Sequence, residues 1–367
     1  MSTSMKQGTI NFDNPISIQE AFKLIITNGA SKTYYLQGEP GIGKSTLHHM
    51  IKDYLGEEEY DHIYLDWSLV DYGEIQMRAP NRETQELELY ISSLLKTKSN
   101  KKKVIMIDEL DKGDKLLQKL GTRLMLDHVV GDWVAPEGSV VFATGNLSTD
   151  GVGNTILAHT SNRVTTMNIR KPTTDEWLAW AGEADIAPEI RTFVAMTPSV
   201  MASYVDGATP DSNPYIFFPL ARNKHFCSPR SLAKCDPDVK NRDRLGSKLT
   251  HAAIAGTIGN KAAEMLSAVC ALKDEIVTTE QVLADPENVP MPEKQAALFM
   301  MMFNAVDVIQ TQDELSKFMK FMNRVTSSEV QSVFFTMAMS HKRLAPMAHK
   351  NAEITTWLKA GNYALLA

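Results

Sequence analysis

The first 170 residues combine short continuous apolar runs with stretches in which apolar residues recur at helical spacing. Segment 32–37 is rich in β-prone residues, and the next segment, 45–55, has apolar residues on one helical face. Two later runs, 104–107 and 139–146, have the composition of strands buried on both faces of a parallel sheet. Strands that alternate with helices predict an α/β domain.

Two helices can be placed by their capping residues. Ser17 can cap a helix that Gly29 ends, and four apolar residues of this segment share one face: Ile18, Phe22, Ile25 and Ile26. Thr173 can cap a second helix, because acidic residues follow at 175 and 176. Pro172 ends the strand pattern before it, so we place the end of the α/β domain at residue 172.

The rest of the chain reads as helical. Segments 295–309, 313–325 and 328–345 carry stripes of methionine and phenylalanine. These stripes indicate a helical core, although methionine also suits an adaptable docking groove. Segment 208–230 reads as a long loop, polar at first and then aromatic, and its length indicates a function because such loops are uncommon in compact domains.

Composition is that of an ordinary soluble protein, with 367 residues, 43% hydrophobic and 22% charged. No apolar run approaches the roughly 18 residues needed to cross a bilayer, and the N-terminus lacks a secretory signal, so we expect a cytoplasmic protein without a membrane contact. The net charge of −6 argues against extended binding to duplex nucleic acid but leaves open a narrow basic pore. The three cysteines (Cys227, Cys235 and Cys270) are interpreted as buried thiols.

The segment GEPGIGKS, residues 38–45, fits the phosphate-loop pattern G-x-x-x-x-G-K-[ST] at every fixed position. Glycines let the backbone curl so that its N–H groups bind phosphate oxygens, and the following helix adds its positive end. Lys44 would bind the β- and γ-phosphates and Ser45 would bind Mg²⁺. The residues expected to hold ATP are Gly38, Glu39, Pro40, Gly41, Ile42, Gly43, Lys44, Ser45 and Thr46.

Polar residues end the two later apolar runs. Asp108 and Glu109 follow the first run, and Asn146 ends the second. Because open α/β sheets bind ligands at the carboxyl ends of their strands, we expect these residues near the phosphate loop. Asp108 would then hold Mg²⁺, Glu109 would act as general base on the attacking water, and Asn146 would orient that water.

These elements, in this order, resemble the AAA+ ATPases, and more narrowly the MoxR-like branch with its phage-encoded members. Residues 38–45 match the Walker A motif, 104–109 the Walker B motif and Asn146 sensor 1. The resemblance implies a P-loop AAA+ core, a parallel sheet flanked by helices, over 16–172 after an arm over 1–15. An all-α lid over 173–242 and an all-α C-terminal extension over 243–367 would follow.

Two arginines match less specific positions of the family. Arg163 corresponds to the arginine finger that enters the site of a neighbouring subunit, with Arg170 as a nearby competitor, and Arg230 corresponds to sensor 2 of the lid. A finger given across an interface makes hydrolysis depend on assembly. The resemblance therefore implies a homo-oligomer, a hexameric ring or spiral. Arg123 is a further candidate for the interface.

The family also suggests what the motor acts on. MoxR-like proteins remodel protein partners, among them von Willebrand A-domain proteins, and carry an insertion that lines the ring face or pore. Segment 66–87 occupies that place and could equally be an ordinary surface hairpin, and 127–138 reads as a second hairpin with Trp133 at its tip or packed on the core.

Two other functions compete with partner remodelling. One is a nucleic-acid motor such as a helicase or loader, which needs a basic pore. The candidates for such a pore are Lys98, Lys101, Lys102, Lys103, Arg78 and Arg82, although 101–103 is better read as the solvated start of a strand. The other is a nucleotide-locked scaffold that turns over slowly.

Overall fold

The computed structural model describes residues 14–97, 99–147, 163–219, 221, 225–272 and 276–359. The chain divides into two compact units, residues 1–171 and residues 172–367. Most of the expected N-terminal arm and the pore candidate Lys98 lie outside the described residues. None of the helices in the described segments combines the length and the apolar character that spanning a membrane requires.

The first unit is built on a five-stranded sheet in which every strand pairing is parallel. The strands follow the spatial order β2-β5-β8-β1-β9, so β8 lies between β5 and β1. Their bounds are Tyr34–Gln37 (β1), Tyr60–Asp66 (β2), Lys102–Asp108 (β5), Val140–Gly145 (β8) and Thr165–Asn168 (β9). The runs predicted to be buried strands, β5 and β8, are buried over almost their whole length.

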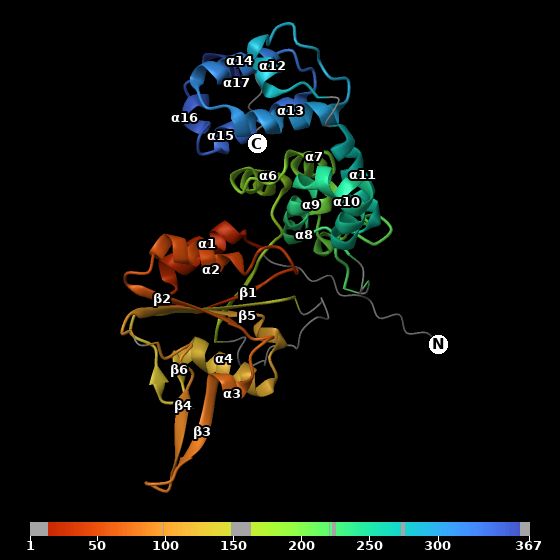
Figure 1. Cartoon of the computed structure of the whole chain (residues 1–367). Helices are drawn as coiled ribbons and strands as arrows, with labels where there is room; N and C mark the ends of the chain where they lie inside the picture. The colour runs from red at the N-terminus through yellow and green to blue at the C-terminus, as the bar shows by residue number, and fades with distance from the viewer. Residues whose placement is uncertain are drawn as a thin grey trace. The chain divides into compact units, whose positions relative to one another are not determined.

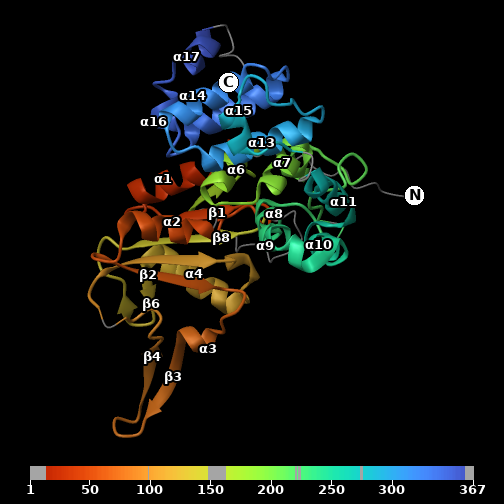
Figure 2. The same cartoon turned by 45° about the horizontal axis from the view of Figure 1, so that its top comes forward.

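Helices cover both faces of this sheet (Figure 1). Alternate strand residues point to opposite faces, so Val104 and Met106 pack with α1 (Ile18–Asn28) and α2 (Thr46–Leu55), whereas Ile105 and Ile107 pack with α4 (Lys115–Asp127). The turned view in Figure 2 shows the same layers. A parallel sheet flanked by helices and followed by helical segments confirms the predicted fold class.

The predicted caps form as expected. The Ser17 hydroxyl accepts from the Glu20 backbone N–H and the Glu20 carboxylate accepts from the Ser17 backbone N–H, which is a capping box, and α1 ends at Gly29. Thr173 forms a second capping box with Glu176 at the start of α6 (Thr174–Glu183). Both helix starts are therefore determined locally.

Two hairpins extend the first unit. After the short helix α3 (Tyr72–Ile75), strands β3 (Gln76–Asn81) and β4 (Glu86–Ile91) form an antiparallel ribbon that projects from the sheet (Figures 1 and 2). The second hairpin, β6 (Val129–Val130) and β7 (Trp133–Val134), places Trp133 half-buried against the core, which is one of its two predicted positions. A Cβ on Gly131 would lie 2.1 Å from Leu89 Cδ2, so the two hairpins pack closely at that glycine.

The second unit is helical throughout its described elements. Its α-helices are α6, α7 (Pro188–Met196), α8 (Pro229–Lys234), α9 (Asp236–Lys240), α10 (Arg242–Ile258), α11 (Asn260–Cys270), α12 (Thr279–Ala284), α13 (Gln295–Val308), α14 (Gln312–Met322), α15 (Ser328–Ser340), α16 (Ala345–Ala348) and α17 (Ala352–Lys359), with 3-10 turns η3 (Pro198–Met201) and η4 (Tyr204–Asp206).

One hydrophobic core runs through this helical unit, from Trp177 in α6 to Trp357 in α17. The methionine and phenylalanine stripes of α13, α14 and α15 lie inside it, which confirms their interpretation as core. The core contains residues on both sides of residue 242. An ion pair also links the two sides, between the fully buried Arg191 of α7 and Asp307 of α13. Cys227 and Cys235 are buried in the same core.

Lys103 corrects the prediction of a solvated strand start. Its side chain is only 2% exposed, and its ammonium donates to Asp61 Oδ2 at 2.5 Å and to Thr97 Oγ1 at 2.6 Å. The Lys102 side chain, in contrast, is 43% exposed and forms a longer contact with Glu59. The prediction was wrong for Lys103 because β2 pairs beside β5 and brings Asp61 level with it, a tertiary contact that three consecutive lysines do not reveal.

We expect Lys103→Met to lower the free energy of unfolding by about 3 kcal/mol, because it leaves the Asp61 carboxylate without its buried cation. Urea unfolding of the full chain at neutral pH measures this change. Lys102→Met is the matched control, since exposed pairs contribute at most about 1 kcal/mol. Equal destabilisation by both substitutions would contradict the assignment.

Candidate functional site

The glycine loop connects the carboxyl end of β1 to the start of α2. Gly41 and Gly43 have positive φ angles of 77° and 102°, a conformation that glycine adopts without steric cost. A Cβ on Gly38 would lie 2.7 Å from the Ile169 carbonyl oxygen, so this position also needs glycine. Within the described part of the chain, the backbone N–H groups of Gly41, Ile42 and Gly43 have no hydrogen-bond acceptor.

Lys44 lies folded over this loop. Its side chain is buried, and its ammonium donates to the carbonyl oxygens of Gly38 at 2.6 Å and Glu39 at 2.8 Å. A longer contact of 3.5 Å reaches Asn146 Oδ1. The cation is thus held over the loop, within reach of Asn146, the residue that follows β8.

Asp108 lies at the carboxyl end of β5 and accepts three hydroxyl groups. Ser45 Oγ and Tyr64 Oη each donate to Oδ2 at 2.6 Å, and Thr144 Oγ1 donates to Oδ1. Burial alone would raise the pKa of Asp108, but these hydrogen bonds hold it below its usual range, so the carboxylate stays ionised. Ser45 and Asp108 were predicted as metal ligands, whereas Tyr64 and Thr144 were not predicted.

Glu109 follows Asp108 in a left-handed backbone conformation, with φ at 55°. Its backbone N–H donates to Thr144 Oγ1 at 3.4 Å. Its carboxylate forms an ion pair with Lys112 at 2.6 Å, and both side chains are about 30% exposed. Partly exposed pairs of this kind contribute about 1 kcal/mol or less, so Glu109 can leave Lys112 at little cost.

Asn146 is buried directly after β8. Its backbone N–H donates to Asp111 Oδ1 at 3.2 Å, and its side-chain oxygen faces Lys44. A Cβ on Gly145 would lie 2.7 Å from the same Asp111 oxygen, so a glycine before Asn146 permits this close approach. The residues predicted from three separate motifs are therefore brought together: Lys44, Ser45, Asp108 and Asn146.

Arg163 lies at the opposite end of the strands, just before the start of β9 (Thr165–Asn168). It is exposed in the turn before β9, and Thr165 pairs with Tyr34, which places Arg163 near the level of Lys32. At about 3.3 Å per residue, the distance from that level to Gly38 is roughly 20 Å. Arg163 therefore cannot reach the glycine loop of its own chain.

Three further arginines were candidates. Arg230 is exposed in the first turn of α8, in the helical unit. Arg123 is exposed on α4, and Arg170 donates to the backbone carbonyl of its neighbour Lys171 at 3.2 Å. The roles predicted for these arginines stay predictions.

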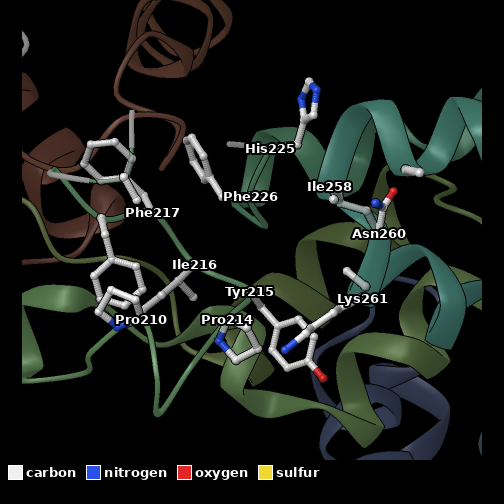
Figure 3. Close-up of a pocket in the computed structure, with 15 residues that line it drawn as sticks. Pro210, Pro214, Tyr215, Ile216, Phe217, His225, Phe226, Ile258, Asn260 and Lys261 are labelled. Carbon is white, nitrogen blue, oxygen red and sulfur yellow. The ribbon is translucent and has the colours of Figure 1, made fainter. Parts of the chain in front are cut away.

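A pocket of about 620 Å³ lies inside the helical unit (Figure 3). The loop predicted to be functional forms one wall with Tyr215, Phe217 and Phe226, and the start of α11 contributes Asn260 and Lys261. Such a volume is within the range of small-molecule pockets. None of the predicted site residues lines this pocket.

The residues at the edge of the sheet fit a magnesium nucleotide. The loop has positive-φ glycines, precedes a helix N-terminus and presents backbone N–H groups that no described residue accepts from, an arrangement that can bind phosphate oxygens. Lys44 is the cation that phosphates require, and the hydroxyl–carboxylate pair of Ser45 and Asp108 offers the oxygen ligands that Mg²⁺ prefers.

Comparisons with known proteins were made for sequence and for structure. No family model and no curated protein matches the sequence. Similar solved structures include a point mutant of Thermotoga maritima RuvB, with 16% identity over 75% of this chain and 79% of that one and a TM-score of 0.34. A second is ATP-bound Brucella abortus NtrX, with 10% identity over 98% of this chain and 71% of that one and a TM-score of 0.35. A third is the S. cerevisiae Hsp104–ADP complex, with 14% identity over 94% of this chain and 48% of that one and a TM-score of 0.32. Likenesses this distant assign no activity to the chain.

Next to the site, His48 of α2 is buried with its ring 5.5 Å from that of Tyr64. Burial lowers its pKa to about 4, helped by the positive potential of His49, His62 and Lys52. The unfolded chain therefore binds a proton at His48 before the folded chain does, and the stabilisation is lost as the pH falls from about 6.5 towards 4.

We expect His48→Phe to remove this pH dependence. Between pH 6.5 and 5, the free energy of unfolding of the wild type should fall by up to about 2 kcal/mol more than that of the variant, at about 1.4 kcal/mol per pH unit. Urea unfolding at half-unit steps of pH measures the difference. Parallel curves for the two proteins would show that His48 does not carry it.

Proposed function

We propose that this chain is a magnesium-dependent ATP-hydrolysing motor of AAA+ type. The observation that carries the proposal is the convergence of Lys44, Asn146 and the Ser45–Asp108 pair beside three backbone N–H groups for which the described residues provide no acceptor. No other arrangement in the described residues offers a cradle, a cation and a metal-binding pair together. Phosphate oxygens would replace the two carbonyl oxygens that Lys44 contacts.

Hydrolysis would use the residues at the ends of β5 and β8. Bound magnesium nucleotide supplies the reactive γ-phosphate and the metal charge that neutralises its oxygens. Glu109 would leave its ion pair with Lys112 and accept the proton of the attacking water. Asn146, which Asp111 holds through the backbone, would orient that water.

The site lacks one part that a second copy of the chain would provide. Arg163 is exposed about 20 Å from its own loop, so only a neighbouring copy could bring it to the phosphates. A guanidinium from a neighbour is the arrangement in which an arginine finger accelerates phosphoryl transfer. We infer that the active form is a homo-oligomeric ring or spiral, with six subunits as the family resemblance implies. Arg230 would contact the phosphates of the bound nucleotide, as sensor 2 of the lid.

We infer a protein as the substrate, as for MoxR-like chaperones, with a von Willebrand A-domain partner as one candidate. The β3–β4 ribbon supports this, because its side chains Met77, Leu87 and Tyr90 are each more than half exposed. Residues 76–91 carry two arginines against three glutamates, a net charge of −1. Exposed apolar groups on an acidic ribbon suit a protein surface better than a phosphate backbone.

A nucleic-acid motor is the second candidate, favoured by exposed Arg78 and Arg82 on the ribbon. Of the lysines considered for a basic pore, Lys103 is buried and Lys102 is ion-paired. Single-stranded DNA separates the two candidates, since strong stimulation of ATP hydrolysis would select the nucleic-acid motor.

We expect Glu109→Gln to lower ATP turnover by 100-fold or more while nucleotide affinity changes little, because the substitution removes the base and keeps the shape of the side chain. Turnover is measured by phosphate release and affinity by a fluorescent ATP analogue. Lys44→Ala is the reference for lost binding, because it removes the cation from the loop. Near-normal turnover by Glu109→Gln would reject Glu109 as the base.

The arginine finger is tested by mixing variants. We expect Arg163→Ala to bind ATP but to hydrolyse it at least about 10³-fold more slowly. Mixing it with Lys44→Ala should restore part of the turnover, since the Lys44→Ala subunit brings an intact Arg163 to a neighbour with an intact loop.

Arg170→Ala is the matched control for this experiment, because Arg170 follows the same strand at its opposite end. It should leave turnover within a fewfold of the wild type. Assembled Arg163→Ala that hydrolyses ATP normally, or a mixture that regains nothing, would contradict the assignment in trans.

A further inference from the structure

Asp108 is held from three directions by hydroxyl groups on three different elements. Ser45 at the start of α2 and Tyr64 of β2 donate to one carboxylate oxygen, and Thr144 of β8 donates to the other. A carboxylate with donors at both oxygens cannot rotate without breaking a hydrogen bond. Of the three donors, Tyr64 lies farthest from the sequence motifs of the site.

The fold places Tyr64 there through the register of the edge strand. Among the strands that the structure describes, β2 pairs with β5 alone, with Tyr64 beside Met106 and Asp66 beside Asp108. Residues two apart on a strand share a face, so Tyr64 lies on the same face of the sheet as Asp108, which is two positions after Met106 on β5. The long Tyr64 side chain extends in the strand direction and reaches the Asp108 carboxylate. Its ring lies edge-on to His48 of α2, with the centroids 5.5 Å apart.

Tyr64 is partly exposed to solvent, although its hydroxyl contacts a buried carboxylate. The residue is 43% exposed, whereas the Asp108 carboxylate that it contacts is buried. A large side chain at a half-exposed position contributes little to the core, and the contact that links Tyr64 to the site is the hydrogen bond from its hydroxyl to Asp108. That partner oxygen is the one that also accepts the Ser45 hydroxyl.

We propose that Tyr64 is a positioning residue for the magnesium site, which fixes the Asp108 carboxylate and, through it, the Ser45 hydroxyl. A hydroxyl that donates its proton to a carboxylate keeps its oxygen lone pairs for a cation. Groups that orient a metal ligand typically change metal affinity 10- to 100-fold when they are removed. This inference rests on the proposed function, since it concerns the same nucleotide site.

The test is Tyr64→Phe in the full-length chain, which removes the hydroxyl and keeps the ring against His48. Binding of a fluorescent ADP analogue is measured against Mg²⁺ concentration and again in EDTA. We expect the Mg²⁺ concentration at half-saturation to rise about 10-fold, with affinity in EDTA unchanged. ATP turnover of the variant should recover to the wild-type rate when Mg²⁺ is raised.

Tyr60→Phe is the matched control. Tyr60 lies on the same face of the same strand, and its hydroxyl has no hydrogen-bond partner within the described residues. Its Mg²⁺ dependence should equal that of the wild type. Thermal unfolding of both variants without nucleotide should stay close to the wild type, which separates positioning from a role in folding.

Each outcome decides one of the two proposals. Wild-type protein that binds no nucleotide would overturn the proposed function and this inference with it. Wild-type protein that binds ADP more tightly with Mg²⁺, beside a Tyr64→Phe variant with the same Mg²⁺ requirement, would overturn the role of Tyr64 alone. The role of Tyr64 would also be overturned if the Tyr64→Phe variant lost ADP binding in EDTA, or if its unfolding temperature fell enough to account for the defect.

Discussion

Parallel pairing of β5, β8 and β1 is the constraint on which the rest of this molecule depends. The pairing brings the carboxyl ends of three strands to one edge of the sheet. The glycine loop, Asp108 and Asn146 leave the sheet at that edge, although more than one hundred positions separate Lys44 from Asn146. The contacts among them follow from strand order, because parallel strands end on the same side.

The same pairing separates Arg163 from this site. β9 runs parallel to β1, so the residue before β9 lies at the opposite edge from the loop after β1. One sheet thus has the glycine loop at one end of its strands and Arg163 at the other, and the two cannot meet within one chain. An enzyme built this way couples catalysis to contact between copies, which is the physical basis for our proposal of an oligomeric motor.

Charge around the site is balanced by short local contacts that a ligand can replace. Lys44 is held by backbone carbonyls, and Glu109 is held by the partly exposed Lys112. Asp108, in contrast, is fixed by three hydroxyl groups and stays ionised. The arrangement combines one rigid carboxylate with two charged groups whose present contacts a ligand could replace, which is consistent with the nucleotide site that we propose.

The sequence by itself determined the local features, because their causes lie within a few residues. The glycine loop, the caps at Ser17 and Thr173, the buried runs of β5 and β8 and the apolar stripes of the helical unit were all predicted and all formed. The meeting of the loop with Asp108 and Asn146 was also predicted, from the common direction of the strands, but only the tertiary structure decided which other residues meet across strands. Tyr64 and Thr144 on Asp108, and the burial of Lys103 against Asp61, depend on strand order and register. A single sequence does not contain that information, since side chains that meet between neighbouring strands leave no fixed spacing along the chain.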